Sequence, residues 1–476
     1  MKTGINALLL ALIFTGAAAA QAPTFNRDIA PILYQNCAAC HRPGEVAPFS
    51  LLTYSDAVKR ASLIVAATQA RYMPPWKPEP GGERFQNERR LTDQQIALIR
   101  RWVDGGTPEG DPAERPQPPT FVQGWKIGEP DQVFSLSKTY ELAAEGPDQF
   151  RCFVVPMNLD HDVYVKNSEF RPGNSRVVHH AIVFTDPTGA AKKIAGVSDS
   201  YPCPGGPGFI ETALIGGWTP GTTPFSPPEG MTALVPKGTN LVLQIHYHPS
   251  GKTELDQSSI GLTYGGPPTV AGDFMLLANW GIDIPAGDSR HVVRSSLTVP
   301  SDLEAIGIAP HAHYLAREMK VTAYDPSGAS RSLITIKTWD FNWQGPYLYT
   351  TPVKLAKGTR IEMEYTYDNS ANNPRNPSNP PVRVKFGEQS TDEMAVAFIL
   401  VRLPSLAGQP AFQGANRLEI LNQLLITGNI NDLPPEFAPV AAPLKMGFQL
   451  FDKDRDGKLD ADERKTFLEM AGTLFR

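Results

Sequence analysis

The stretch 177–184, VVHHAIVF, places two adjacent histidines inside a run of branched and aromatic residues. Such residues favour strands, so the run predicts a buried strand. Successive side chains of a regular strand point to opposite faces, which would separate His179 from His180. If both imidazoles serve one metal ion, the strand must end or bulge at this point.

Histidine clusters recur further along the chain. Six of the nine histidines form three tight groups, which are His179 with His180, His246 with His248 and His311 with His313. Each neutral imidazole needs both a donor and an acceptor partner, so buried groups of this kind are difficult to satisfy without a metal ion. The clusters contain no carboxylate, which disfavours non-haem iron, and no cysteine lies beside them, which disfavours blue copper. Imidazole together with the soft thioether of methionine favours copper.

The order of these motifs is specific. VVHH, LQIHYH, PHAH and TDEMAVAFILV follow one another between residues 118 and 405, and this order resembles the copper type II, ascorbate-dependent monooxygenases, such as peptidylglycine hydroxylase and dopamine β-monooxygenase. The resemblance implies two successive jelly-roll-like β-sandwich domains, which we place at 116–268 and 269–405. Each would hold one copper ion, and the two ions would face each other across an open cleft.

The resemblance also implies the ligands and the activity. One copper ion, which supplies electrons, would be bound by His179, His180 and His246. The other copper ion binds dioxygen and is catalytic, and it would be bound by His311, His313 and Met394. Gln244 could orient a ligand imidazole from the second shell. His248 and Met319 are rival ligands, whereas His161 and His291 are expected to be surface or structural residues. The implied reaction is hydroxylation of a C–H bond of an organic substrate by O2, with ascorbate as the electron donor in animal members.

Two features depart from the peptide-hydroxylating members. Ala309 stands where those enzymes have an arginine that binds a substrate carboxylate, and Val396 and Phe398 stand where they have polar residues. A less acidic, more apolar small-molecule substrate is therefore expected. The alternative is a non-catalytic electron-transfer or copper-binding protein that has kept these sites.

The motif CAACH at 37–41 predicts a covalent haem c, with Cys37 and Cys40 bonded to the haem and His41 as an axial ligand of the iron. Zinc would need two further ligands nearby, and the next histidine is His161. Met73, on the proline-rich loop RYMPPWKP, is the natural second axial ligand, a pairing suited to electron transfer. Three amphipathic helices are expected around it, and the segment resembles a class I cytochrome c, so we place an all-α cytochrome c domain at 23–115. We expect this haem to deliver electrons to the copper bound by the first histidine cluster.

The N-terminal residues 1–22 read as a secretory signal peptide, with a lysine, an apolar run and small residues at the cleavage site. A retained membrane anchor is the less favoured interpretation, and no later apolar run is long enough to span a membrane. Export permits a disulfide, and Cys152 and Cys203 are the candidate pair. Haem c and export together predict a periplasmic protein, with secretion as the alternative. The electron donor would be ascorbate or a periplasmic reductant.

The C-terminal sequence DKDRDGKLDADE fits an EF-hand calcium loop at every ligand position. The expected ligands are Asp452, Asp454, Asp456, the carbonyl of Lys458, Asp460 and Glu463. We place a linker with a helix at 406–442 and a small α EF-hand tail at 443–476. The formal net charge is −5 with no basic stripe, so no nucleic-acid partner is expected.

Overall fold

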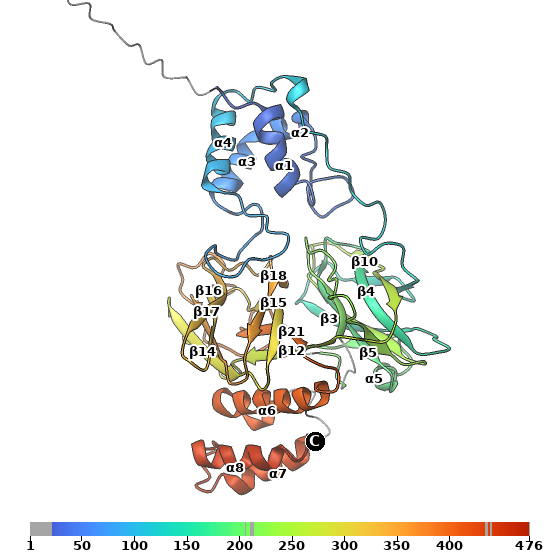
Figure 1. Cartoon of the computed structure of the whole chain (residues 1–476), viewed down its shortest axis with the longest axis vertical. Coiled ribbons are helices and arrows are strands. Elements are labelled where there is room, and N and C mark those ends of the chain that lie inside the picture. The colour runs from blue at the N-terminus through green and yellow to red at the C-terminus, as the bar shows by residue number, and fades with distance from the viewer. Residues whose placement is uncertain (1–20, 205, 210–213, 434–436, 438–439, 476) are drawn as a thin grey trace, which may run out of the picture. The chain divides into compact units, whose positions relative to one another are not determined.

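The structure is a computed structural model, and it describes residues 21–204, 206–209, 214–433, 437 and 440–475. The fold is mostly β, with several sheets and a smaller share of helix (Figure 1). It divides into two compact units: residues 1–74 with 89–120, and residues 75–88 with 121–476. The predicted signal peptide lies almost wholly outside the described residues.

The smaller unit is helical in its described part. Its elements are η1 (Phe25–Ile29), α1 (Ala30–Asn36), α2 (Tyr54–Lys59), α3 (Ala61–Gln69), α4 (Asp93–Asp104) and η2 (Pro112–Glu114). Thr92 begins α4 with a capping box, in which its side chain accepts a hydrogen bond from the Gln95 backbone. Phe25, Ile29 and Trp102 are fully buried in one core, which joins η1 to α4.

The larger unit begins with two sheets that share a hydrophobic core, here called the first sheet pair. One sheet has the order β1 (Gln132–Ser135), β11 (Ser259–Gly265), β4 (Val163–Arg171), β8 (Ala233–Val235). The other has the order β6 (Ser200–Pro202), β3 (Gln149–Pro156), β9 (Asn240–Tyr247), β5 (Val178–Asp186), β7 (Leu214–Trp218). A short ribbon of β2 (Tyr140–Leu142) and β10 (Glu254–Asp256) and the helix α5 (Ala190–Ala195) complete this part.

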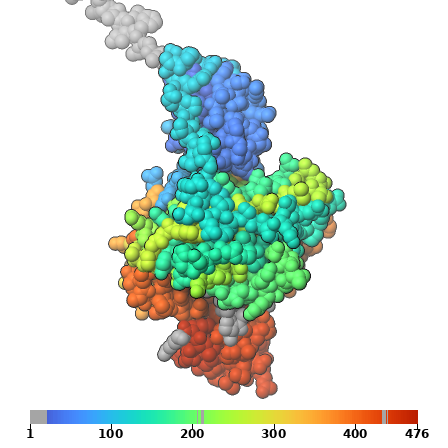
Figure 2. Space-filling view, turned by 90° about the vertical axis from the view of Figure 1, so that its right-hand side faces the viewer, coloured from blue at the N-terminus to red at the C-terminus, as the bar shows by residue number. Residues whose placement is uncertain are grey.

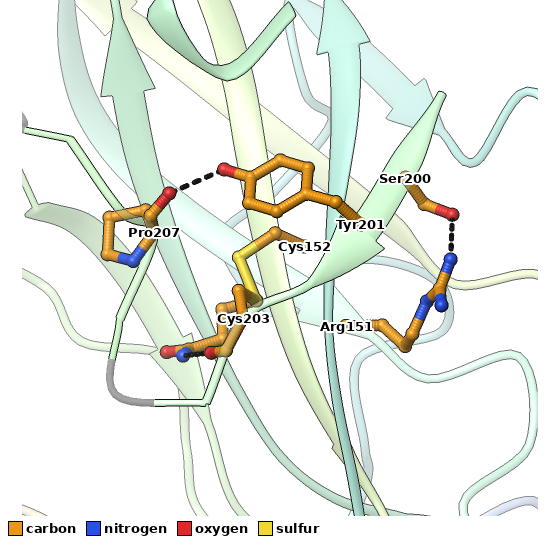
Figure 3. The surroundings of a disulfide bond; sticks show 7 residues. Arg151, Cys152, Ser200, Tyr201, Cys203 and Pro207 are labelled. Carbon is orange, nitrogen blue, oxygen red and sulfur yellow. Dashed lines mark hydrogen bonds between the residues drawn. A yellow bond between two sulfur atoms is a disulfide. The ribbon is translucent and has the colours of Figure 1, made fainter. Parts of the chain in front are cut away.

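The side-chain alternation of β9 separates the core from the opposite face. Leu241, Leu243 and Ile245 are fully buried in the core between the two sheets. The alternating residues Gln244 and His246 therefore lie on the other face of the five-stranded sheet. The same face carries the Cys152–Cys203 disulfide, as predicted, with the Cα atoms 5.7 Å apart. Figure 3 shows this disulfide beside Tyr201, whose hydroxyl donates to the Pro207 carbonyl at 2.6 Å.

Two further sheets share the largest core and form the second sheet pair. One has the order β12 (Ala271–Ala278), β21 (Val396–Leu403), β15 (Leu303–His311), β18 (Tyr347–Leu355). The other has the order β14 (His291–Thr298), β19 (Arg360–Tyr367), β16 (Ala316–Tyr324), β17 (Ser330–Ile336), and β13 (Asp283–Ile284) pairs with β20 (Val384–Lys385). Figure 2 shows the larger unit from a side on which the first sheet pair, coloured teal to green, forms much of the surface.

Helices follow the last strand of the second sheet pair. They are α6 (Gln409–Thr427), η3 (Ile430–Asp432), α7 (Ala441–Phe451) and α8 (Ala461–Ala471). The Asn416 and Gln423 amides donate to the carbonyls of Phe274 and Leu276, at 3.0 and 3.1 Å, so α6 is fixed along β12 (Figure 1). Among the described residues, no helix is both long and apolar enough to cross a membrane.

Candidate metal sites

Three imidazoles converge on the outer face of the five-stranded sheet. His180 and His246 are direct cross-strand partners on β5 and β9. The Nδ1 atom of His180 lies 3.3 Å from that of His179 and 3.4 Å from that of His246. One ligand atom from each of the three residues lies within 4.8 Å of the others, which is close enough to hold one ion. We call these residues the first histidine group.

A register shift explains how adjacent histidines can share a site. The pairing of β5 with β9 shifts between Val178 and His180, so His179 lies at an irregularity in the strand. The extra residue of a bulge re-aims its side chain, which brings the His179 imidazole to the same side as its neighbour. We expected the strand to end or bulge here if both histidines share one ion; the register is irregular at this point, and β5 continues beyond it to Asp186.

The protonation states of His179 and His180 favour the binding of a cation. Burial lowers the pKa of His179 to about 3, and burial places the pKa of His180 well below its usual range. Both imidazoles are therefore neutral near pH 7, which leaves a nitrogen lone pair on each. Neutral imidazole is the form that binds a metal ion.

Asp148 supports this group and was missed by the sequence analysis. Its Oδ2 atom lies 3.0 Å from His246 Nε2, and its Oδ1 atom lies 2.7 Å from His248 Nδ1. Burial alone would raise the pKa of Asp148, but the hydrogen bonds from His246, Ser390 and His248 outweigh it and hold this pKa well below its usual range. A carboxylate on the outer nitrogen of a ligand histidine fixes the ring and its tautomer. No motif surrounds Asp148 in the sequence, so only its position in the fold identifies it.

His311 and His313 form a second histidine group at the end of β15. Their ring centroids are 5.2 Å apart and their planes are nearly perpendicular, at 84°. His311 Nδ1 lies 2.6 Å from Gln344 Oε1, and His313 Nδ1 lies 3.1 Å from the Asp392 carbonyl. The Nδ1 atoms are thereby occupied, so each ring keeps its Nε2 atom for a metal ion. Burial lowers the pKa of His313 to about 3.

The strand register relates Met394 to this second group. β15 pairs with β21 so that His311 is opposite Val396 and Pro310 is opposite Ala397. β15 ends at His311 and β21 begins at Val396, so His313 and Met394 each lie two residues beyond the paired strands. The segments that carry these two predicted ligands therefore leave the sheet at the same end of one strand pair.

Glu393, another residue that the sequence did not single out, binds the backbone of the two segments that carry His313 and Met394. Its side chain is fully buried and accepts hydrogen bonds from the backbone N–H groups of His313, of Leu315 at 2.9 Å and of Met394 at 3.0 Å. Burial raises the pKa of Glu393 to about 8. One carboxyl group therefore binds the backbone of a predicted histidine ligand and of the predicted methionine ligand. Glu393 directly precedes Met394 in the motif TDEM, but nothing in the sequence predicted that it would contact His313.

The segment 339–345, here called the bridging loop, connects the two histidine groups. Phe341 stacks on His179, with ring centroids 4.7 Å apart and planes at 19°. The same ring lies 5.5 Å from the His313 ring. The resemblance implies an open cleft between the two coppers, whereas at this point one phenylalanine contacts a histidine of each group.

The remaining candidate ligands lie in other settings. Gln244 donates its amide to the Cys203 carbonyl at 2.9 Å, so this bond goes to the disulfide and not to an imidazole. His248 is bonded to Asp148, and its side chain is 64% exposed. Met319 is fully buried in the core of the second sheet pair. His161 and His291 each bind a nearby aspartate, Asp160 and Asp288.

The haem motif lies at the end of α1. Cys37 and Cys40 are free thiols, and the N–H of His41 donates to the Cys37 carbonyl at 2.9 Å. His41 Nδ1 lies 3.2 Å from the Phe49 carbonyl, which leaves its Nε2 atom for an iron ion. These residues fit a covalent haem because both sulfur atoms are unbonded and the imidazole is oriented by its other nitrogen. Met73 lies in the same compact unit.

The predicted calcium loop joins α7 to α8. Carboxylate oxygens of Asp452, Asp454 and Asp456 lie within 4.8 Å of one another. Gly457, at φ +83°, makes the sharp turn that the sixth position of such a loop requires. Asp452 Oδ1 is buried without a hydrogen-bond partner, which is the environment expected of a cation ligand. Asp460 caps α8 together with Glu463 in a capping box, and the Lys458 N–H binds Asp456 at 2.8 Å.

Comparison with known proteins identifies no family for this chain. No family model and no curated protein matches the chain. Among solved structures, the VP2 subviral particle of infectious bursal disease virus aligns with 58% of this chain and 72% of its own, at 8% identity and a TM-score of 0.17. Dimeric latent PorU from Porphyromonas gingivalis aligns with 54% of this chain and 24% of its own, at 8% identity and a TM-score of 0.16. Scores this low carry no argument about fold or function.

Proposed function

We propose that the protein is an exported copper-dependent monooxygenase that hydroxylates a C–H bond of a small organic substrate with O2. The observation that carries this proposal is the convergence of His179, His180 and His246 on one face, within 4.8 Å, beside a second group of two histidines. The first and second sheet pairs would then be the two jelly-roll-like copper domains of the type II family.

The ligand chemistry supports copper at both groups. The first group offers three imidazoles, and the second offers two imidazoles with Met394 at the same end of the β15–β21 pair. Copper accepts imidazole and, in its reduced form, thioether ligands. Copper bound with a free coordination position would supply oxygen activation, and copper at the first group would supply a further electron. Within the protein, Asp148 orients His246, and Gln344 orients His311.

The surroundings of the second group support a neutral, partly apolar substrate. Ala309, Val396 and Phe398 belong to β15 and β21, and Ala309 is paired with Phe398. Phe398 is 37% exposed, so an apolar ring borders the strand face that carries His311. An apolar border disfavours a charged substrate because desolvation of its charge would not be compensated.

The other two motifs complete the proposal. Haem c, bound by Cys37, Cys40 and His41 with Met73, would deliver electrons to the first histidine group from ascorbate or a periplasmic donor. Calcium would stabilise the C-terminal helices, held by Asp452, Asp454, Asp456, the carbonyl of Lys458, Asp460 and Glu463. A periplasmic location follows from the signal peptide and the haem, with secretion as the alternative.

Oxygen consumption tests the proposal. Copper-loaded, haem-containing protein is supplied with ascorbate and a panel of neutral organic substrates, and O2 uptake is measured together with product formation. We expect substrate-dependent uptake that Met394→Ile abolishes, while Met319→Ile, in the buried core, leaves it intact. Absence of substrate-dependent uptake across the panel, with copper bound at both groups, would instead support a non-catalytic copper and electron-transfer protein.

A further inference from the structure

A segment from within the N-terminal sequence is part of the larger unit. Residues 75–88, here called the strap, belong to this unit, although the sequence on both sides of them belongs to the smaller one. The Glu79 N–H donates to the Thr335 carbonyl at 2.7 Å, and the Gln86 N–H donates to the Leu348 carbonyl at 2.7 Å. The strap is therefore hydrogen-bonded to β17 and to β18. It lies within 23–115, which the sequence analysis assigned to the cytochrome c domain.

Aromatic rings and a buried ion pair anchor the first residues of the strap. Trp76 packs edge-on against Tyr347, with ring centroids 5.5 Å apart. Lys77 Nζ lies 3.7 Å from Asp340 Oδ2, and the two side chains are only 7% and 12% exposed. Burial lowers the pKa of Lys77, which Asp340 partly opposes. Ion pairs this poorly solvated are costly to build, and removing one partner leaves an uncompensated buried charge.

Asp340 belongs to the bridging loop, which contacts ligands of both histidine groups. The next residue, Phe341, stacks on His179 at 4.7 Å. Trp339 Nε1 donates to the His313 carbonyl at 3.1 Å, and Gln344 Oε1 lies 2.6 Å from His311 Nδ1. The Gln344 carbonyl also accepts a hydrogen bond from Thr219 of the first sheet pair at 2.7 Å. These hydrogen bonds to both sheet pairs hold the bridging loop in place, and this fixes the Phe341 ring against His179.

The strap is covalently continuous with the predicted haem ligand and reaches the bridging loop through the Lys77–Asp340 ion pair. Met73 stands three residues before Trp76 and four before Lys77 in the sequence. From Lys77 the connection crosses one ion pair to Asp340, passes along one peptide bond to Phe341 and then crosses one ring contact to His179. Two non-covalent steps therefore separate the Met73 chain segment from a predicted copper ligand.

We infer that Lys77, Asp340 and Phe341 form the path by which electrons pass from the haem end of the chain to the first histidine group. The inference rests on the proposed function, since it requires haem at Cys37, Cys40 and His41 and copper at His179. One electron moves in each step, so that ferrous haem becomes ferric while Cu(II) becomes Cu(I), and no atom or proton needs to be transferred. Lys77 and Asp340 are positioning residues that hold the Phe341 ring, and the ring provides the contact with the ligand.

A kinetic measurement on the full-length holoprotein tests the path. Under anaerobic conditions the ferric, Cu(II) protein is flash-reduced at the haem with a photogenerated flavin semiquinone, and haem absorbance is followed together with the Cu(II) electron paramagnetic resonance signal. In the wild type we expect first-order haem reoxidation with matching loss of the Cu(II) signal, at a rate independent of protein concentration. Phe341→Leu should slow this step by roughly tenfold or more, equivalent to about 1.4 kcal/mol in the barrier. Phe341→Tyr, which keeps a ring against His179, should restore it.

Two further variants keep the test decisive. Lys77→Met removes the ion pair at a distance from the metal ligands and should also slow the step, whereas Phe274→Leu, on β12, should leave it unchanged. Copper content and the haem spectrum are measured for each variant, so that loss of a cofactor is not mistaken for loss of the path. Wild-type protein whose haem reoxidation does not depend on copper would overturn the proposed haem-to-copper delivery itself. Copper-dependent reoxidation at the wild-type rate in both Phe341→Leu and Lys77→Met would overturn the path and leave the proposed function standing.

Discussion

Asp148 accepts a hydrogen bond from His246, with Oδ2 3.0 Å from Nε2, and both side chains are buried. The same carboxylate accepts a hydrogen bond from Ser390 at 2.8 Å, a residue four positions before Met394. Asp148 therefore connects a predicted ligand of the first histidine group to the segment that leads to the second. A single buried carboxylate thus supports the arrangement of both candidate metal sites.

Loss of the Asp148 charge should weaken metal binding at the first histidine group. In Asp148→Asn the His246 ring loses its charged partner, and we expect the Cu(I) affinity to fall by roughly 10-fold or more, since such outer partners are typically worth about 10–100-fold. Competition with a colorimetric Cu(I) chelator measures the affinity. Asp160→Asn, which removes the exposed partner of His161, is the matched control and should bind copper as the wild type does. Equal affinity in both variants would contradict a supporting role for Asp148.

Glu419 of α6 provides a test by pH away from the metal sites. Burial raises its pKa above the usual value, although the Thr298 backbone hydrogen bond partly opposes this. The folded state then binds the proton more tightly than the unfolded state, so stability falls as pH rises through the interval between the two pKa values. Glu419→Gln should therefore raise the melting temperature of the larger unit at pH 7.5 and have little effect at pH 4, by differential scanning calorimetry. Glu469→Gln, at an exposed position of α8, is the matched control for the loss of one carboxylate.

Removal of the Cys152–Cys203 disulfide should destabilise the first sheet pair. The bond closes a loop across 51 residues, and a native disulfide typically contributes about 2–5 kcal/mol. The double variant Cys152→Ala with Cys203→Ala should lower the free energy of unfolding by this amount, measured by chemical denaturation. A reductant should reproduce the loss in the wild type and have no further effect on the variant. An unchanged unfolding midpoint would show that the disulfide is dispensable for stability.

Calcium should stabilise the C-terminal helices. A ligand that binds only the folded state contributes about 2.7 kcal/mol at a concentration 100 times its Kd. Calcium titration should therefore raise the melting temperature of these helices, and Asp452→Asn should remove the effect because Asp452 Oδ1 has no other partner in the loop. Asp462→Asn, an exposed position in the first turn of α8, should retain it. A calcium response that survives Asp452→Asn would place the cation elsewhere.

Local sequence determined those features that depend on residues close together in the chain. The pattern of VVHHAIVF predicted a buried strand, and β5 covers Val178–Asp186. Thr92 and Gly105 cap the two ends of α4, because helix caps are satisfied within a few residues. Four cysteines and one haem motif left Cys152 and Cys203 as the candidate pair, and they are bonded.

Only the tertiary structure decided which distant groups support the candidate sites. Asp148 lies 98 residues from His246, Glu393 lies 78 residues from Leu315, and Lys77 pairs with Asp340 although they are far apart in the chain. No periodicity or spacing encodes such partners, because they are set by the packing of strands from separate parts of the sequence. The residue types in the sequence therefore predicted the kinds of ligand that the protein offers to metal ions and haem. The fold decided which carboxylates, amides and rings surround each histidine, because hydrogen bonds and ring contacts act over only a few ångströms.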